Sequence, residues 1–335
     1  MLPLRFVPYS DAAEVPNVVV DGSANAGTVL TLSHWPGMPT PPDLRDDLSA
    51  QIAFRALDQP HRLDGIEAVT NNHFDQDGLV SVFALVQPDL AMQRRDVLID
   101  IARAGDFGTF EHRDAARVAM VIAALDDDER SPLDRASLSL PYPQRCATLY
   151  EWALPRLTDM ADHPERWREL WDDEDAHLAE SLVAIESGIA TIEERREIDL
   201  AIVRVPDEWA QRATHRFTQT WTEALHPMAV NNSTECLRVL LIHGPRYRLE
   251  LRYESWVMLV SRQVLPRPDL RTLAARLDTL EPGGPRWHAD APGSLTPKLE
   301  LVGDVESGLP VGAFIAEVER FLATAPAAWD PFAPR

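Results

Sequence analysis

The chain has 335 residues, of which 45% are hydrophobic and 25% charged, a composition typical of a globular protein large enough for two domains. Its 53 acidic residues outnumber 32 basic ones and give a net charge of −21, which disfavours binding to long nucleic acid, because such proteins present basic surfaces to the phosphates. No apolar run approaches the roughly 20 residues of a membrane helix, and the two isolated cysteines suit neither a disulfide framework nor a zinc cluster.

Strand-like and helix-like stretches alternate over the first 125 residues. Two β-branched runs, 17–20 and 28–32, predict strands, and a helix is expected over about 43–57, where Asp and Pro give a start signal. A third strand is predicted for 65–70. Helices are then expected near 79–86, 92–103 and 115–125. This alternation predicts an α/β fold, with a mostly parallel, doubly wound sheet domain over residues 1–140.

The rest of the chain predicts a helical segment followed by a second domain. Residues 141–197 are rich in Leu, Trp, Glu and Arg and predict a helical connector after an acidic, Pro-containing boundary. From residue 198 the pattern changes to strands, expected at 199–205, 237–243, 247–253 and 256–261. Helices are expected at 269–280 and 310–323. Residues 198–330 therefore predict a smaller α+β domain on the substrate side.

The most informative segment follows the strand expected at 65–70. It places His73, Asp75 and Asp77 at alternate positions before Gly78. On an extended chain alternate side chains share a face, so the three could converge on one point beside a helix N-terminus. Carboxylate oxygens with one imidazole suit Mn²⁺ or Mg²⁺. An Asp-x-Asp-Gly string can also be a tight turn, but a strand, an acidic loop and an apolar helix in succession favour a site.

Other polar residues follow the remaining strands of the first domain. Asp21 ends one strand and His34 follows the next, and the ends of parallel strands share one edge of a sheet. Asp46, Asp47 and Asp106 are further candidates. Each alone could be an ordinary turn, loop or surface residue. Together these carboxylates and imidazoles resemble a two-metal hydrolase site, in which two ions activate a water and neutralise phosphoryl oxygens.

The segment 73–81 resembles the first motif of the DHH phosphoesterase superfamily, particularly its nuclease-like branch, where a His/Asp-x-Asp-x-Asp-Gly stretch holds Mn²⁺. Asp21, after three valines, resembles the isolated Asp that the family carries at a strand end. Residues 33–35, Ser-His-Trp, resemble in position the Asp-His-His that names the family, but keep only the central His. Residues 47–54 resemble the following segment, in which a ligand Asp opens a helix.

The order of these motifs differs from that of the family. The acidic motif comes first in the family and last here. A circular permutation of the domain would explain the difference, because the positions in the sheet would be unchanged while the chain begins elsewhere. The changes to Ser33 and Trp35 put the second metal ion, and catalysis itself, in question.

The resemblance implies Mn²⁺-dependent hydrolysis of a phosphodiester or phosphoanhydride in a small nucleotide, a short oligonucleotide or polyphosphate. The expected ligands of one or two Mn²⁺ (or Mg²⁺) ions are Asp21, His34, Asp47, His73, Asp75, Asp77 and Asp106. We expect the 73–77 motif to bind a first ion and Asp21 to bridge the two ions. His34 with Asp47 is expected to complete the binding site of a second ion. Asp75, Asp77 and His34 are the expected catalytic residues, and Asp106 a ligand or a partner of His73.

The C-terminal half carries weaker matches to the substrate-binding domain of that family. Arg252, within 249–253, resembles its strand with a phosphate-binding Arg, and Gly283 with Gly284 resembles its Gly-rich substrate loop. Arg262 is an alternative donor. Arg252 could instead be a cross-strand partner of a carboxylate, and two glycines between prolines are first of all a loop.

Two other functions remain open from the sequence. One is a non-catalytic metal- or nucleotide-binding protein derived from the same family, and the other is an interaction protein whose acidic surface docks a basic partner. The expected partner of the site is a small phosphorylated molecule, and no membrane is expected. The sequence is compatible with a homodimer. Because the chain begins without a signal-peptide pattern, we expect it in the cytoplasm.

Overall fold

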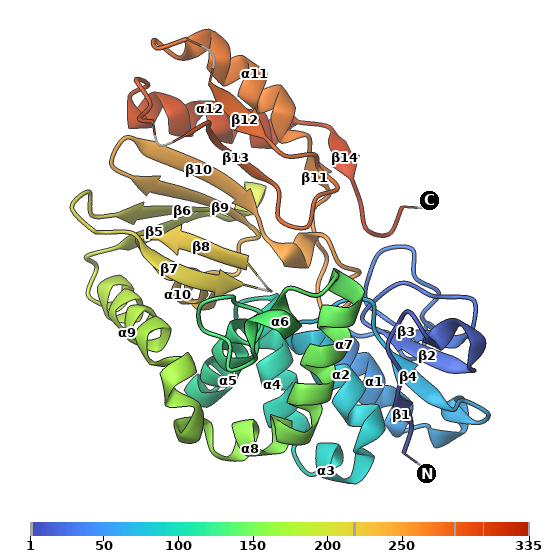
Figure 1. The fold of residues 1–335 in the computed structure, drawn as a ribbon. Helices are drawn as coiled ribbons and strands as arrows, with labels where there is room; N and C mark the ends of the chain where they lie inside the picture. The colour runs from blue at the N-terminus through green and yellow to red at the C-terminus, as the bar shows by residue number, and fades with distance from the viewer. Residues whose placement is uncertain (1–2, 217–218, 285, 304, 334–335) are drawn as a thin grey trace. The chain divides into compact units, whose positions relative to one another are not determined.

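The computed structural model describes residues 3–216, 219–284, 286–303 and 305–333, and confirms the expected α/β class. The chain divides into two compact units (Figure 1). The first contains Met1–Ala176 and Ala213–Thr222, and the second contains His177–Arg212 and Glu223–Arg335. No helix in the described ranges is long and apolar enough to cross a membrane.

The first unit contains a four-stranded sheet in which all neighbouring strands are parallel, as expected. The spatial order is β1-β4-β2-β3. The strands are β1 (Arg5–Phe6), β2 (Asn17–Val20), β3 (Thr28–Leu32) and β4 (Ala68–Thr70). The central strands β2 and β4 are buried along their whole length, which is why they read as continuous apolar runs rather than as alternating ones.

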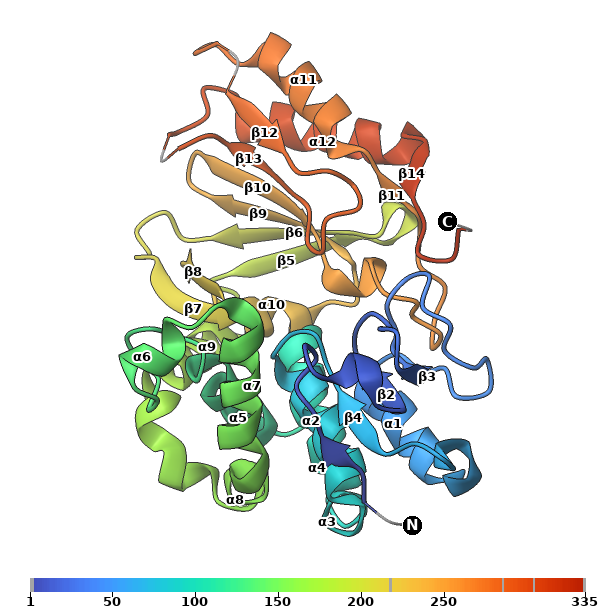
Figure 2. The same cartoon turned by 45° about the vertical axis from the view of Figure 1, so that its right-hand side comes forward.

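Helices make up most of the first unit. They are α1 (Ser49–Leu57), α2 (Gln76–Val86), α3 (Pro88–Met92), α4 (Arg95–Asp106), α5 (Arg113–Ala124), α6 (Arg135–Leu138), α7 (Tyr142–Ala153) and α8 (Leu157–Asp162), with 3-10 helices η1 (Ala12–Glu14), η2 (Pro60–Leu63), η3 (Leu154–Arg156) and η4 (Pro164–Leu170). Both α1 and α2 pack against strands, α4 packs against α2, and α5 packs against α4 (Figure 2). Enclosed in this way, α2 is apolar and buried on almost every side.

The connection between β2 and β3 contains no helix, and the expected order of elements likewise placed none there. Residues 21–27 alone return the chain to the start of a parallel neighbour, a shorter path than such crossovers usually take. The buried amide of Asn17 donates to Asn25 Oδ1 in this connection at 3.0 Å, and also to the carbonyl oxygens of Ala12 and Val15 at 2.7 and 2.9 Å. A Cβ on Gly27 would lie 2.5 Å from the Val15 oxygen, so only glycine fits.

The second unit contains a six-stranded mixed sheet in the order β12-β13-β10-β9-β6-β5, in which β6 and β9 are parallel and the other pairs antiparallel. Its strands are β5 (Thr191–Arg195), β6 (Leu200–Val205), β9 (Arg238–His243), β10 (Arg246–Leu251), β12 (Trp287–Ala289) and β13 (Lys298–Leu301). Its helices are α10 (Pro227–Ser233), α11 (Leu270–Leu280), α12 (Val311–Thr324), η5 (Arg196–Ile198) and η6 (Tyr253–Ser255), and it shares α9 (Asp172–Glu186) with the first unit. It also contains the pair β11 (Arg267–Pro268) with β14 (Ala327–Trp329), whereas most of the pair β7 (Arg212–Arg216) with β8 (Gln219–Glu223) belongs to the first unit.

Alternating side chains divide the core of the second unit between the two faces of its sheet. Leu240 and Ile242 of β9 pack in one cluster with Phe314 of α12 and residues of α11. Val239 and Leu241 of the same strand pack in another cluster with residues of α9 and α10. Figure 2 shows α11 and α12 together on one side of this sheet.

Three expected elements differ from the structure. Residues 191–195, expected as helix, form β5 because they pair antiparallel with β6, so strand pairing outweighs helix propensity. Residues 256–261, expected as a strand, form none, because the chain turns after β10 into η6, where Ser255 hydrogen-bonds back to Arg252. The helix expected from residue 43 begins only at Ser49. The expected connector is shared, with α7 and α8 in the first unit and β5 in the second.

Replacing Asn17 by Ala should lower the free energy of unfolding by about 2–3 kcal/mol, because it removes the hydrogen bonds of a buried amide to the backbone oxygens of Ala12 and Val15 and to Asn25 Oδ1. Urea denaturation followed by tryptophan fluorescence measures this loss. The matched control is Gln144→Ala, which removes an exposed amide. Equal stabilities of the two variants would contradict the role given to Asn17.

Candidate metal centre

Three neighbouring parallel strands end at one edge of the first unit's sheet. Asp21 follows β2 directly, His34 lies two residues beyond β3, and the acidic motif follows β4. Asp21 has a φ of 45°, a left-handed conformation that Asp tolerates better than most residues. A Cβ on Gly22 would lie 2.0 Å from Asn72 Oδ1. The Asp-Gly turn after β2 is therefore packed directly onto the residues that follow β4.

The first group of converging ligand atoms is completely buried. His34 Nε2 lies 3.3 Å from Asp21 Oδ1, 3.5 Å from Asp106 Oδ2 and 3.8 Å from Asp77 Oδ2. No side chain of these four is more than 1% exposed. One ligand atom from each residue lies within 4.8 Å of the other three, so a single metal ion could bind all four.

The orientation of His34 is fixed by its other ring nitrogen. Nδ1 lies 2.6 Å from the backbone oxygen of Asp47. Because a carbonyl oxygen can only accept, Nδ1 must carry a proton, and in the neutral imidazole Nε2 then presents a lone pair to three carboxylates. Lone pairs that face one another need a cation between them, which is either a proton or a metal ion.

Asp77 is held by the beginning of a neighbouring helix. Its carboxylate accepts hydrogen bonds from the backbone N–H groups of Ser49 at 2.8 Å and Ala50 at 2.7 Å, the first residues of α1. The positive end of α1 therefore stabilises this buried charge. The Ser49 hydroxyl also donates to Asp21 Oδ1 at 2.8 Å, a contact that the sequence analysis missed. The only indication of this contact in the sequence is that Ser49 lies two residues after Asp47, the residue expected to open a helix.

Asp106 reaches the centre because α4 and α2 approach closely. Gly105 makes this possible, since a Cβ there would lie 2.4 Å from Cβ of Gln76. The Gln76 amide in turn donates to the backbone oxygen of Ala119 at 2.8 Å and so ties the start of α2 to α5. The last residue of α4 is thereby placed beside the first residues of α2.

The second group of ligand atoms lies nearer the surface and shares one residue with the first. His73 Nε2 is 3.3 Å from Asp21 Oδ2 and 2.9 Å from Asp75 Oδ2, and its side chain is 18% exposed. Asp75 is the N-cap of α2, and its Oδ1 accepts a hydrogen bond from Gly78 N at 2.8 Å. Asp21 thus offers one carboxylate oxygen to each group, the arrangement of a ligand that bridges two ions.

The grouping of ligands differs from the expected one. Asp77 was expected to join His73 and Asp75, but its carboxylate lies in the other group, with His34. The helix begins at residue 76, between the two, so Asp75 keeps an extended backbone while Asp77 lies in the helix, and the alternation expected of one extended strand does not apply. Asp106 likewise lies with His34 and not beside His73. The carboxylate of Asp47 belongs to neither group, and its contribution is the carbonyl oxygen that orients His34.

The charges of the cluster are strongly coupled. Burial raises the pKa of Asp21, but hydrogen bonds from His34 and His73 outweigh burial and hold this pKa below its usual range. Burial lowers the pKa of each imidazole, yet their carboxylate neighbours raise it overall, most strongly for His73. Burial and the charge of Asp21 raise the pKa of Asp77 to about 7. Near neutral pH the cluster therefore retains protons that a metal ion would displace.

The residues expected to contact substrate lie in the second unit. Arg252 is 3% exposed, donates to the backbone oxygen of Thr234 at 3.1 Å and pairs with Glu254. Arg262 is exposed and donates to a backbone oxygen at 2.8 Å. Gly283 and Gly284 lie in the turn after α11. Their role in binding substrate stays a prediction.

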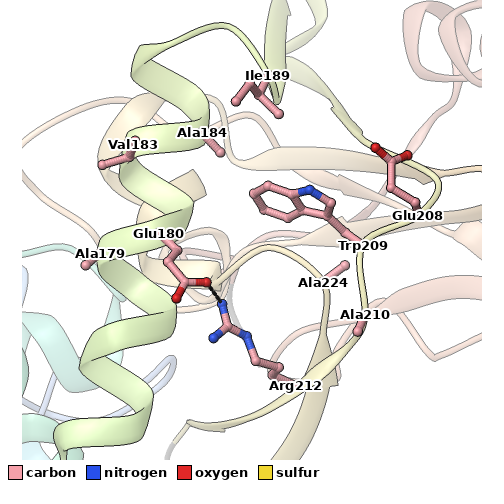
Figure 3. Close-up of a pocket in the computed structure, with 10 residues that line it drawn as sticks. All are labelled: Ala179, Glu180, Val183, Ala184, Ile189, Glu208, Trp209, Ala210, Arg212 and Ala224. Atoms are coloured by element: carbon pink, nitrogen blue, oxygen red, sulfur yellow. Dashed lines mark hydrogen bonds and ion pairs between the residues drawn. The ribbon is translucent and has the colours of Figure 1, made fainter.

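A pocket of about 630 Å³ in the second unit has a different character. It lies between α9 and residues 208–212, with Trp209 facing Ala184 across it (Figure 3). Its walls are mainly apolar, and Glu180 pairs with Arg212 at its rim. Of the described residues, none that line it belongs to a group of converging metal-type ligands. The converging metal-type ligands found among the described residues lie instead at the strand ends of the first unit.

The chain belongs to a family described as "Family of unknown function (DUF6687)", whose model matches residues 2–333. No curated protein and no solved structure matches the chain. Because the family has no assigned activity, the geometry of the site is the basis for inferring a function for this chain.

The stability of the metal-free protein should fall as the pH rises between about 6 and 8. Asp77 and both imidazoles have pKa values above their usual ones, so the folded state binds more protons than the unfolded chain in this window. Melting temperatures in a chelator measure the decline, and Mn²⁺ should raise them more at the higher pH. A metal-free melting temperature that increases with pH across this window would contradict the coupling, and Asp77→Asn should flatten the decline.

Proposed function

We propose that the protein is a two-metal phosphoesterase. Its substrate would be a phosphodiester or phosphoanhydride in a small nucleotide, a short oligonucleotide or polyphosphate, and its cofactor Mn²⁺ or Mg²⁺. The observation that carries the proposal is that two groups of buried ligand atoms share the carboxylate of Asp21. A paired site of this kind suits in-line displacement at phosphorus, in which the attacking and leaving oxygens both need stabilisation.

The donor set fits hard divalent ions. Four carboxylates meet two imidazoles, and neither group includes a thiolate. Burying several carboxylates together is costly unless cations compensate their charge. When bound, the metal ions supply that charge, polarise the phosphoryl group and lower the pKa of a water.

The residues of the chain hold this centre ready before metal binds. The backbone oxygen of Asp47 fixes the tautomer of His34, and two N–H groups of α1 hold Asp77. These contacts fix the buried group, whereas His73 and Asp75 form the more accessible one. We assign the accessible group to the side on which the phosphate approaches, and the buried group to holding the first ion.

The resemblance to the DHH phosphoesterases supports the same reaction. Asp21, His34 and the acidic motif lie at the ends of neighbouring parallel strands and meet in space despite their unusual order along the chain. That is the result a circular permutation would give. We therefore propose a permuted member of that superfamily.

A non-catalytic binding protein is the second candidate, and the residues on either side of His34 favour it. The Ser33 hydroxyl, at the position of the family's first Asp, accepts a hydrogen bond from Trp35 N at 3.2 Å. The Trp35 ring, at the position of its last His, packs against His73 with the ring centroids 5.2 Å apart. Both residues thus have packing roles where the family has ligands, and turnover decides between the candidates.

Asp75→Asn should remove the more accessible ion and leave the buried one, because Asp75 contributes only to the group with His73. Calorimetric titration of Mn²⁺ into metal-stripped protein should show two ions for the wild type and one for the variant. Turnover of bis(p-nitrophenyl) phosphate and of a dinucleotide should fall at least about 100-fold, as expected when one ion of a pair is lost. Wild-type protein that binds two ions but turns over neither compound would favour the binding protein.

Asp77→Asn should weaken the buried ion instead, because Asp77 belongs to the group with His34 and Asp106. The same titration distinguishes the two variants by which binding step disappears. Asp96→Asn is the charge-matched control, since Asp96 is exposed on α4 and outside both groups. If wild-type protein binds no Mn²⁺, or if Asp96→Asn weakens binding as much as the other two, the metal centre is wrongly assigned.

A further inference from the structure

Helix α7, from the segment expected to be a mere connector, brings a tyrosine hydroxyl to the start of α2. The Tyr150 side chain is completely buried. Its ring packs between Phe6 and Phe74, with centroid separations of 4.9 and 5.2 Å. Two aromatic contacts fix the ring, so the position of the hydroxyl is determined by packing rather than by a flexible stem.

The hydroxyl lies beside a ligand of the more accessible metal group. A Cβ on Gly78 would be 2.3 Å from Asn71 Nδ2, 2.7 Å from the Tyr150 hydroxyl and 3.0 Å from Asp75 Oδ1. Three polar atoms therefore surround one face of Gly78, and the missing side chain leaves them room. Two of the atoms are donors, and the third is the carboxylate oxygen of Asp75 that does not face His73.

The orientation of the Asn71 amide is determined by its other end. Asn71 Oδ1 accepts a hydrogen bond from His73 N at 3.0 Å, so Nδ2 must point to the Gly78 side. Neither this nitrogen nor the Tyr150 hydroxyl has a hydrogen-bond partner among the described residues, although both are buried. Buried donors in folded proteins are almost always paired with an acceptor or an ordered water.

Asp75 Oδ1 is the acceptor that suits both donors. It receives one hydrogen bond, from Gly78 N, and a carboxylate oxygen can accept a second. Burial and the charge of Asp75 raise the pKa of Tyr150 well above its usual value, so the phenol keeps the proton that it would donate.

We propose that Tyr150, together with Asn71, is a positioning residue that orients the Asp75 carboxylate for the metal ion bound by His73 and Asp75. The two donors hold Oδ1 on the α2 side, directly or through one bridging water, and so direct Oδ2 towards the ion. Hydrogen bonds behind a metal ligand commonly change metal affinity about 10- to 100-fold. The inference rests on the two-metal centre proposed above and makes α7 part of that centre.

Tyr150→Phe tests the inference, because it removes the hydroxyl and keeps the aromatic packing. Mn²⁺ titration into metal-stripped protein should show the weaker binding step reduced about 10-fold or more, with the tighter step unchanged. In electron paramagnetic resonance, the exchange-coupled signal of two neighbouring Mn²⁺ ions should give way to that of a single ion. A merely structural hydroxyl would alter the melting temperature without changing either readout.

Tyr247→Phe is the matched control, since its buried hydroxyl donates to Leu309 O at 3.0 Å in the second unit and should leave both binding steps unchanged. Gly78→Ala is a second variant, because its Cβ would displace Asn71 and Tyr150, and it too should lose the weaker ion. Two ions bound equally well by the wild type and Tyr150→Phe would overturn this inference alone. A wild type that binds no Mn²⁺ would overturn the two-metal centre and this inference with it.

Discussion

The buried carboxylate of Asp21 is the interaction on which the rest of the first unit depends. It lies between the Nε2 atoms of two histidines at 3.3 Å from each, at the end of a strand buried on both faces. Because burial alone would favour its neutral form, its ionised state depends on those imidazoles or on cations that replace their protons. The ends of β3 and β4 bring the two imidazoles to this carboxylate, and the start of α1 brings the Ser49 hydroxyl.

Two helix beginnings stabilise the carboxylates that lie around Asp21. The first residues of α1 donate to Asp77, and the first turn of α2 donates to Asp75. Oriented backbone N–H groups stabilise negative charge without adding side chains that would occupy the ligand positions. The result is a pair of carboxylates held by backbone N–H groups, with Oδ2 of Asp75 and Oδ2 of Asp77 close to the imidazoles. Such preorganisation is what a metal centre needs in order to bind ions without rearranging.

Membership of the DUF6687 family does not identify a reaction. The proposed reaction therefore depends on the chemistry of the two ligand groups. A carboxylate shared between two ligand groups is the basis for proposing two-metal phosphoryl hydrolysis, and the two groups differ in burial. Tyr150 of helix α7 is proposed to orient the Asp75 carboxylate of the more accessible group. A segment that looks like a spacer in sequence thus contributes to the geometry of the centre.

The sequence by itself determined three of the four parallel strands, β1 being missed, and the polar residues that gather at their ends, because buried strands read as apolar runs and polar residues directly after them mark one sheet edge. Only the tertiary structure decided how the ligands divide. Asp75 and Asp77 separate into two groups because α2 begins between them, and the exact start of a helix depends on packing rather than on local pattern. Ser49 and Tyr150 reach the centre from distant parts of the chain, which no local spacing records.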